Sequence, residues 1–169
     1  AVSFKDRIPD ENDFCDLGFF DLSQPEIFNK LSTTSSFNWQ QGSMLQWLGP
    51  DHTQKIIFND MDSDGKKFIS KILDIETGEE RILPFPIYSV DLLGKNAFSI
   101  DFERHYWFRR GYAYAGIKNK KKSAYFDPHD GILILDLDSG SSKKIISLAE
   151  LIELNQVSSM HEAAHYIEH

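Results

Sequence analysis

The chain is poor in cysteine, in net positive charge and in long apolar runs. Its 169 residues include one cysteine, which excludes an intrachain disulfide framework and a Cys-rich zinc site. Acidic residues outnumber basic ones by 26 to 18, and the resulting formal net charge of -8 argues against nucleic-acid binding through general phosphate neutralisation. No run approaches the roughly 18 apolar residues of a membrane span, and the first residues lack a signal-peptide pattern. We therefore expect no nucleic-acid or membrane partner, and a cytoplasmic location, or a periplasmic one if a signal peptide has been removed.

The chain does contain an internal repeat, in which an apolar β-rich run ends in Asp, one more apolar residue and a turn. The copies lie at 17–25, 71–78 and 133–140 and carry Asp21, Asp74 and Asp136. The second and third copies place Gly where a hairpin turn needs positive φ, and short β-rich runs follow at 80–83 and 143–147. Each copy therefore predicts a strand, a tight turn and a second strand.

Further β-rich runs complete the second and third repeats. They lie at 43–48 and 55–59 before the second copy, and at 88–92 and 97–102 before the third. The repeat spacing exceeds the roughly 40 to 50 residues of a four-stranded propeller blade, and an insert at 103–130 accounts for the longest gap. The pattern predicts an all-β fold of antiparallel four-stranded β-propeller blades, with almost no helix outside about 148–154. A single antiparallel β-sandwich is the alternative.

In this interpretation the whole chain, residues 1–169, is a single partial propeller. Residues 1–33 end one blade, 34–87 form the second blade, 88–151 form the third with its insert, and 152–169 are a linker and the start of the next blade. Propellers contain about four to eight blades. We therefore expect a piece of a longer chain, or self-association with a second copy through the open blade edges.

Three segments carry a resemblance to a known family. They are 37–48 with its Trp-Gln-Gln-Gly, 109–117 with Arg-Arg-Gly-Tyr-Ala-Tyr, and 165–169. In these segments the chain resembles bacterial β-propellers related to oligogalacturonate lyases and to TolB-like propellers, over about residues 14–169. Family members usually have Arg-Pro-Gly-Tyr in the second segment and continue past the last residue of this chain. The resemblance implies a seven-bladed ring with a divalent metal such as manganese in its channel, and uronate cleavage by β-elimination in the lyases.

The histidines at the end of the chain are the candidate metal ligands. The resemblance makes 165–169 the start of an inner strand, where His165 and His169 share one face because the side-chain period is two. There His165 would be a metal ligand and His169 a ligand or a base. Hydrogen-bonded histidines without a metal are the alternative. Residues 161–165 also match the H-E-x-x-H pattern of zinc proteases, which requires a helix and a third ligand further on.

The insert is dense in arginine, lysine and aromatic residues. Arginine binds carboxylates in a bidentate manner, and aromatic faces stack against sugar rings. We expect Arg110 to hold a uronate carboxylate during catalysis, with Arg109, Tyr112 and Tyr114 as further substrate-binding residues. Gln41, at the entry to an inner strand, is a further candidate because its amide can bind sugar hydroxyls. The alternative is a solvated loop whose aromatic residues pack on the blade edge.

The segment 59–65 spaces three aspartates as a calcium loop does. Lys71 occupies the loop position where calcium requires a bidentate carboxylate, so a hairpin turn is the favoured interpretation.

Two classes of function remain open on the sequence alone. One is a metal-assisted polysaccharide lyase that acts on acidic oligosaccharide, in which a metal or an arginine stabilises the enolate-like charge. The other is a non-catalytic propeller module that binds glycan or protein.

Overall fold

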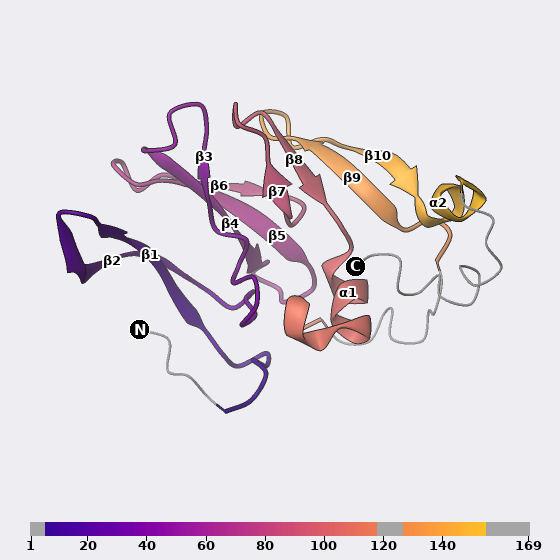
Figure 1. The fold of residues 1–169 in the computed structure, drawn as a ribbon, viewed down its shortest axis with the longest axis horizontal. Coiled ribbons are helices and arrows are strands. Elements are labelled where there is room, and N and C mark those ends of the chain that lie inside the picture. The colour runs from indigo at the N-terminus through magenta and orange to yellow at the C-terminus, as the bar shows by residue number, and fades with distance from the viewer. Residues whose placement is uncertain (1–5, 118–126, 155–169) are drawn as a thin grey trace.

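A computed structural model describes residues 6–117 and 127–154. Within these ranges antiparallel strands form three sheets that follow one another in chain order (Figure 1). The first sheet is the hairpin of β1 (Cys15–Asp21) and β2 (Gln24–Thr34). The second is formed by β3 (Gln46–Leu48), β4 (Lys55–Met61), β5 (Phe68–Asp74) and β6 (Glu80–Leu83), and the third by β7 (Ser89–Val90), β8 (Asn96–Ser99), β9 (Gly131–Asp136) and β10 (Ser142–Ser147). The all-β class predicted from the sequence is confirmed.

The two larger sheets are built alike. In each, four strands pair with their neighbours in sequence order, so each sheet is a simple up-and-down meander. Asp74 ends β5 and Asp136 ends β9, the third strand of its own sheet in both cases. Their carbonyl oxygens accept hydrogen bonds of 2.9 Å from the backbone N–H groups of Gly78 and Gly140, which have φ of 74° and 70°. Glycine suits these positions because a positive φ costs it little.

The aspartate side chains hold these turns closed. The Asp74 carboxylate accepts backbone hydrogen bonds of 3.1 Å from Glu76 and Thr77, and the Asp136 carboxylate accepts equivalent bonds of 3.0 and 2.7 Å from Asp138 and Ser139. The turn after β1 is shorter, and Asp21 there accepts a bond of 2.7 Å from the Ser23 N–H. Side-chain acceptors of this kind explain why Asp recurs where the strands end.

The second sheet is buried on both faces. Ile57 and Ile72 pack against the third sheet in a core that also contains Ala97, Leu135 and Leu137. Alternate residues of the same strands, among them Ile56, Phe58 and Leu73, pack toward the first hairpin in a second core with Cys15, Leu17 and Phe37. The chain therefore carries the continuous apolar run 56–58 in place of an alternating pattern.

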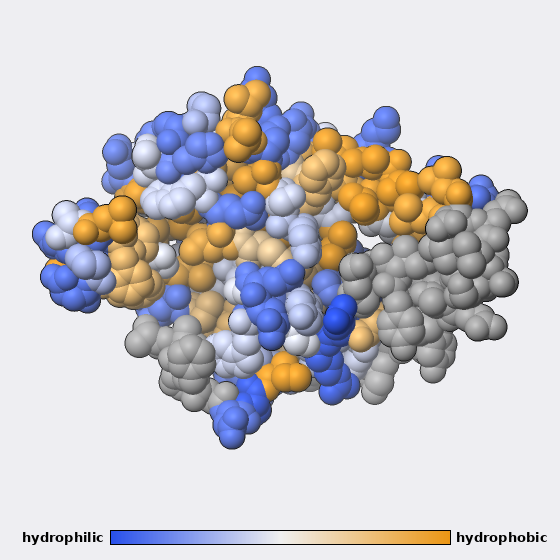
Figure 2. All heavy atoms as spheres, in the orientation of Figure 1, coloured by the Kyte–Doolittle hydropathy of each residue, from blue (hydrophilic) through white to orange (hydrophobic). Residues whose placement is uncertain are grey.

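The far face of the third sheet is apolar and uncovered in the described structure. Phe98 is 46% exposed, Ile132 is 38% exposed and Ile145 is 51% exposed. Phe98 pairs with Ile134 across β8 and β9, and Ile132 pairs with Ile146 across β9 and β10, so these four side chains share one face. Ile145 stands at the register irregularity of β10 between Lys144 and Ile146. Figure 2 shows this apolar surface over β9 and β10.

The described helices are short. α2 (Leu148–Leu154) coincides with the helix predicted at 148–154, but α1 (Phe102–Phe108) and the 3-10 turn η1 (Arg110–Tyr112) lie in the insert. In the described residues, helix outside about 148–154 is thus limited to these two short elements. The Asp101 carboxylate caps α1 by accepting a hydrogen bond of 2.9 Å from the Arg104 N–H. In the described ranges, neither helix is long and apolar enough to cross a membrane.

Candidate functional site

The first part of the insert folds onto the core between the second and third sheets. Phe102, at the start of α1, stacks on Tyr114 with ring centroids 4.8 Å apart and planes 3° from parallel. Each of these two residues is 1% exposed. Burial of the stacked pair fixes both ends of the segment that carries α1 and η1.

A polar network joins this segment to the second sheet. Asn59 on β4 is fully buried, and its amide nitrogen donates to the Tyr114 hydroxyl at 2.9 Å and to the Ile87 carbonyl at 2.7 Å. Its amide oxygen accepts from the Ile87 N–H at 2.7 Å. Burial raises the pKa of Tyr114 well above its ordinary value, so its hydroxyl stays neutral. One side chain thus connects β4, the β6–β7 connection and the insert.

The segment held in this way presents an arginine–aromatic surface, formed by Tyr106, Trp107, Arg109, Arg110 and Tyr112. The Arg109 guanidinium lies 4.9 Å from the centre of the Tyr112 ring. The Arg110 guanidinium lies 5.8 Å from the Tyr106 ring and 5.6 Å from the Trp107 ring. Both arginines are exposed, and in the described part of the chain neither forms an ion pair with a carboxylate.

This stacking leaves the edges of the guanidinium groups available. A guanidinium that lies on an aromatic ring keeps its N–H groups at its rim, where a carboxylate can accept two of them at once. The ring also restricts the arginine side chain, which lowers the entropy lost when a ligand binds. The surface is therefore suited to a ligand that carries carboxylates and flat or apolar faces.

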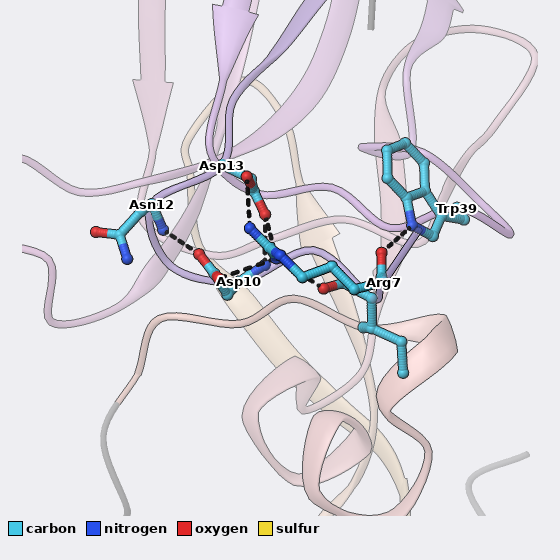
Figure 3. A network of polar contacts seen from close by, with 6 residues as sticks. Arg7, Asp10, Asn12, Asp13 and Trp39 are labelled. Atoms are coloured by element: carbon cyan, nitrogen blue, oxygen red, sulfur yellow. Dashed lines mark hydrogen bonds and ion pairs between the residues drawn. The ribbon is translucent and has the colours of Figure 1, made fainter. Parts of the chain in front are cut away.

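The segment before β1 packs beside this surface. The Arg7 guanidinium binds both carboxylate oxygens of Asp13, at 2.7 and 3.1 Å, and also contacts Asp10 at 2.9 Å. The Trp39 indole N–H donates to the Arg7 carbonyl at 2.9 Å. Figure 3 shows how these contacts tie the segment to the loop that carries Trp39. A short segment without regular secondary structure is thereby held in place.

A hollow of 440 Å³ separates this segment from the insert. Its lining includes Asp10, Glu11 and Asn12 on one side, and Tyr106 and Trp107 on the other. The Asp10 carboxylate is already engaged by Arg7 and by the Asn12 N–H. The aromatic side of the hollow thus continues onto the rings that support Arg110.

The structure brings together three of the predicted site residues, Arg109, Arg110 and Tyr112. It places Tyr114 in the core, where the hydroxyl is bound to Asn59, so this ring offers no face to a ligand in the described structure. The Gln41 amide nitrogen donates to the Tyr88 hydroxyl at 2.8 Å. The predicted ligands His165 and His169 lie outside the described residues, as does the H-E-x-x-H segment.

No group of three or more potential metal ligands from His, Cys, Asp and Glu occurs in residues 6–117 and 127–154. The aspartates of segment 59–65 point to different partners: Asp60 contacts the Lys71 ammonium at 2.9 Å, and Asp62 accepts from the Lys66 and Lys67 N–H groups at 2.7 and 3.1 Å. These residues form the β4–β5 hairpin. Cys15 is buried, and burial raises the pKa of its thiol to about 11, so it is not a reactive thiolate at neutral pH.

Two contributors to the site are not predicted from the sequence. The segment 6–13 has no β-pattern or helix pattern, and only its Pro9-Asp10 pair indicates a turn. In the sequence, Asn59 looks like any other residue of a strand, because the three groups that its amide binds belong to distant parts of the chain. The signal for α1 was present, since Asp101 followed by an acidic Glu103 is a typical helix start.

Comparisons of the chain with family models, with curated proteins and with solved structures give no match.

Proposed function

We propose that this chain is part of a β-propeller and that its arginine–aromatic surface binds acidic oligosaccharide. The propeller proposal is supported by two successive four-stranded meanders that share one turn design and pack face to face. Gln46 joins their first strands, because its amide accepts from the Val90 N–H at 3.1 Å and donates to the Tyr88 carbonyl at 3.4 Å. Close first strands are what a radial arrangement of blades requires.

The uncovered apolar face of the third sheet fits the same proposal. The second sheet has a neighbour on each face, whereas the third has a described neighbour on one face only. A further four-stranded sheet packed on Phe98, Ile132 and Ile145 would continue the series. A seven-bladed ring is the form that the family resemblance implies.

The binding proposal rests on one observation: Arg109 and Arg110 are exposed, stacked on aromatic rings and unpaired with any carboxylate of the described chain. On a chain of net charge -8, two neighbouring free guanidinium groups form a local site for anions. A uronate residue offers a carboxylate for the guanidinium and a ring face for the aromatic side chains. A neutral sugar offers only the second of these.

Calorimetric titration with oligogalacturonate tests this proposal. We expect Arg109→Gln and Arg110→Gln each to weaken binding by about tenfold, the value of one charge-assisted hydrogen bond. The matched control is Lys95→Gln, an exposed lysine of the β7–β8 turn, which should leave affinity unchanged. Equal affinity for the oligosaccharide after chemical reduction of its carboxylates would exclude the proposed recognition.

A lyase and a non-catalytic binding module would share this surface. In β-elimination a base removes the proton beside the uronate carboxylate, the glycosidic oxygen leaves, and a conjugated double bond forms. His169 as base or ligand and His165 as ligand belong to the lyase proposal, as does a manganese-like metal. Ultraviolet absorbance of the unsaturated product, measured on the full chain with manganese, separates the two: a signal that His169→Asn abolishes supports the lyase, and binding without a signal supports the module.

A further inference from the structure

A second hollow lies between the ends of the second and third sheets, beside α1. Its volume is 420 Å³, within the range of ligand sites. The β4–β5 hairpin, the β6–β7 connection, the first turn of α1 and the start of β9 surround it. We call it the inter-sheet pocket. Its apolar walls are Phe68, Phe85, Phe102, Ile117 and Leu133.

Cationic side chains also line the inter-sheet pocket. Lys66, Lys67 and Lys144 line it and are exposed. The Lys66 ammonium pairs with Asp64 at 3.0 Å, and the Lys144 ammonium donates to the His129 carbonyl. Neither Lys67 nor Lys144 forms an ion pair with a carboxylate in the described part of the chain. Both ammonium groups therefore keep donors for a bound anion.

Three acidic residues also line the pocket, and two of them contact α1. Asp101 caps the helix through the Arg104 N–H at 2.9 Å, and the Asp130 carboxylate lies 3.5 Å from the Arg104 guanidinium, which is fully buried. Glu103, the third acidic lining residue, stands in the first turn of α1. The pocket thus has an apolar interior, acidic lining residues of which Asp130 faces Arg104, and two ammonium groups that are not paired with a carboxylate in the described residues.

We propose that the inter-sheet pocket binds an amphipathic carboxylate, with the anionic head at Lys67 and Lys144 and an apolar chain or ring against the phenylalanine walls. The apolar walls offer little to the hydroxyl groups of a sugar, which distinguishes this pocket from the arginine–aromatic surface. Apolar walls supply affinity by excluding water, and the ammonium groups select the charge of the head.

Fluorescence of anilinonaphthalene sulfonate tests the pocket, because this dye joins an anionic group to aromatic rings. We expect dye bound to the full chain to be displaced by decanoate. Decanol and decyltrimethylammonium, which share the chain but lack the negative head, should displace it at least about tenfold more weakly. Displacement by decanol as strong as that by decanoate would overturn the proposal.

Substitutions locate the binding. Lys67→Gln with Lys144→Gln should weaken decanoate binding by about tenfold or more, whereas the exposed-lysine control Lys95→Gln should not. Since the dye also adheres to apolar surfaces, Ile145→Lys at an exposed apolar position of the third sheet is a second control. A decanoate-sensitive signal that is lost in Ile145→Lys and retained in the double lysine variant would assign the site to the sheet face and contradict the proposal.

Discussion

At the scale of single residues, Asn59 is a buried polar group whose amide makes three hydrogen bonds. It is fully buried and connects three segments through its amide, and Ile87 depends on it for both of its backbone partners. The Tyr114 hydroxyl accepts one hydrogen bond from the same amide. Buried polar groups that lose their partners cost more than the hydrogen bond itself contributes.

Truncation at these two positions should therefore have unequal effects. We expect Tyr114→Phe to lower the free energy of unfolding by about 1 kcal/mol, the value of one hydrogen bond. Asn59→Ala should lower it by about 3 kcal/mol, because the buried N–H and C=O groups of Ile87 lose their partner. Urea denaturation of the three proteins measures both changes. Equal losses of unfolding free energy in the two variants would show that water takes the place of the Asn59 amide in its hydrogen bonds.

The sequence analysis selected Arg109 and Arg110 but gave no physical ground for separating them from Arg104, to which the structure assigns different surroundings. Arg104 faces inward from α1 beside Asp130 and is fully buried, whereas Arg109 and Arg110 follow the helix and are exposed. That difference depends on the helical phase of α1. When this aromatic segment is interpreted as a strand, the sequence does not show which of its side chains face the core. The binding residues could therefore be chosen by residue type but not by orientation.

At the scale of elements, the repeated turns were predictable because their signal is local. Asp74 and Asp136 bind backbone groups two and three residues further on, and Gly78 and Gly140 follow in the same window. The bounds of β6 and α2 were also predicted. The stacking of the sheets and the position of segment 6–13 depend on long-range contacts, which no local pattern encodes.

The turn aspartates make the stability of these elements depend on pH. Backbone hydrogen bonds, from Thr77 first for Asp74 and from Ser139 first for Asp136, hold the pKa of both carboxyls below its ordinary value. A lowered folded-state pKa contributes stability above the unfolded value of about 3.9, and this contribution is lost as pH falls through the folded value.

We expect the thermal midpoint to fall as pH is lowered from neutral to about pH 3. In the Asp74→Asn, Asp136→Asn double variant the fall should be smaller, since amide oxygens keep the turn bonds but do not titrate. Circular dichroism across the pH series measures this difference. If the thermal midpoint falls equally with pH in the wild type and the double variant, the titrating groups are not Asp74 and Asp136.

Asp101, the residue that caps α1, allows a test of whether the candidate site depends on the end of this helix. Asp101→Ala removes the acceptor for the Arg104 N–H, so we expect a loss of about 1 kcal/mol in unfolding free energy together with weaker oligogalacturonate binding. Asp101→Asn keeps an effective cap and should retain both properties more closely. Unchanged binding in Asp101→Ala would show that the surface does not depend on the helix end.

At the scale of the whole molecule, the far face of the third sheet is apolar and uncovered in the described residues. Exposed faces of this kind associate. We expect light scattering to give a mass above the 19.5 kDa of one chain, and Ile132→Lys with Ile145→Lys to bring the mass back to that of a monomer. A wild-type chain that stays at 19.5 kDa at all concentrations would contradict the proposed stacking of a further sheet.

The central claim is that Arg109 and Arg110 hold the carboxylates of an acidic oligosaccharide, and side-chain nuclear magnetic resonance of arginine tests it most directly. The Nε–Hε signals of these two residues should shift and sharpen as oligogalacturonate is added, because their N–H groups gain an acceptor. The signals of Arg81, which donates to the Leu137 and Asp138 carbonyls, and of buried Arg104 should stay in place. Shifts confined to Arg81, or no arginine shift at a concentration where calorimetry detects binding, would contradict the claim.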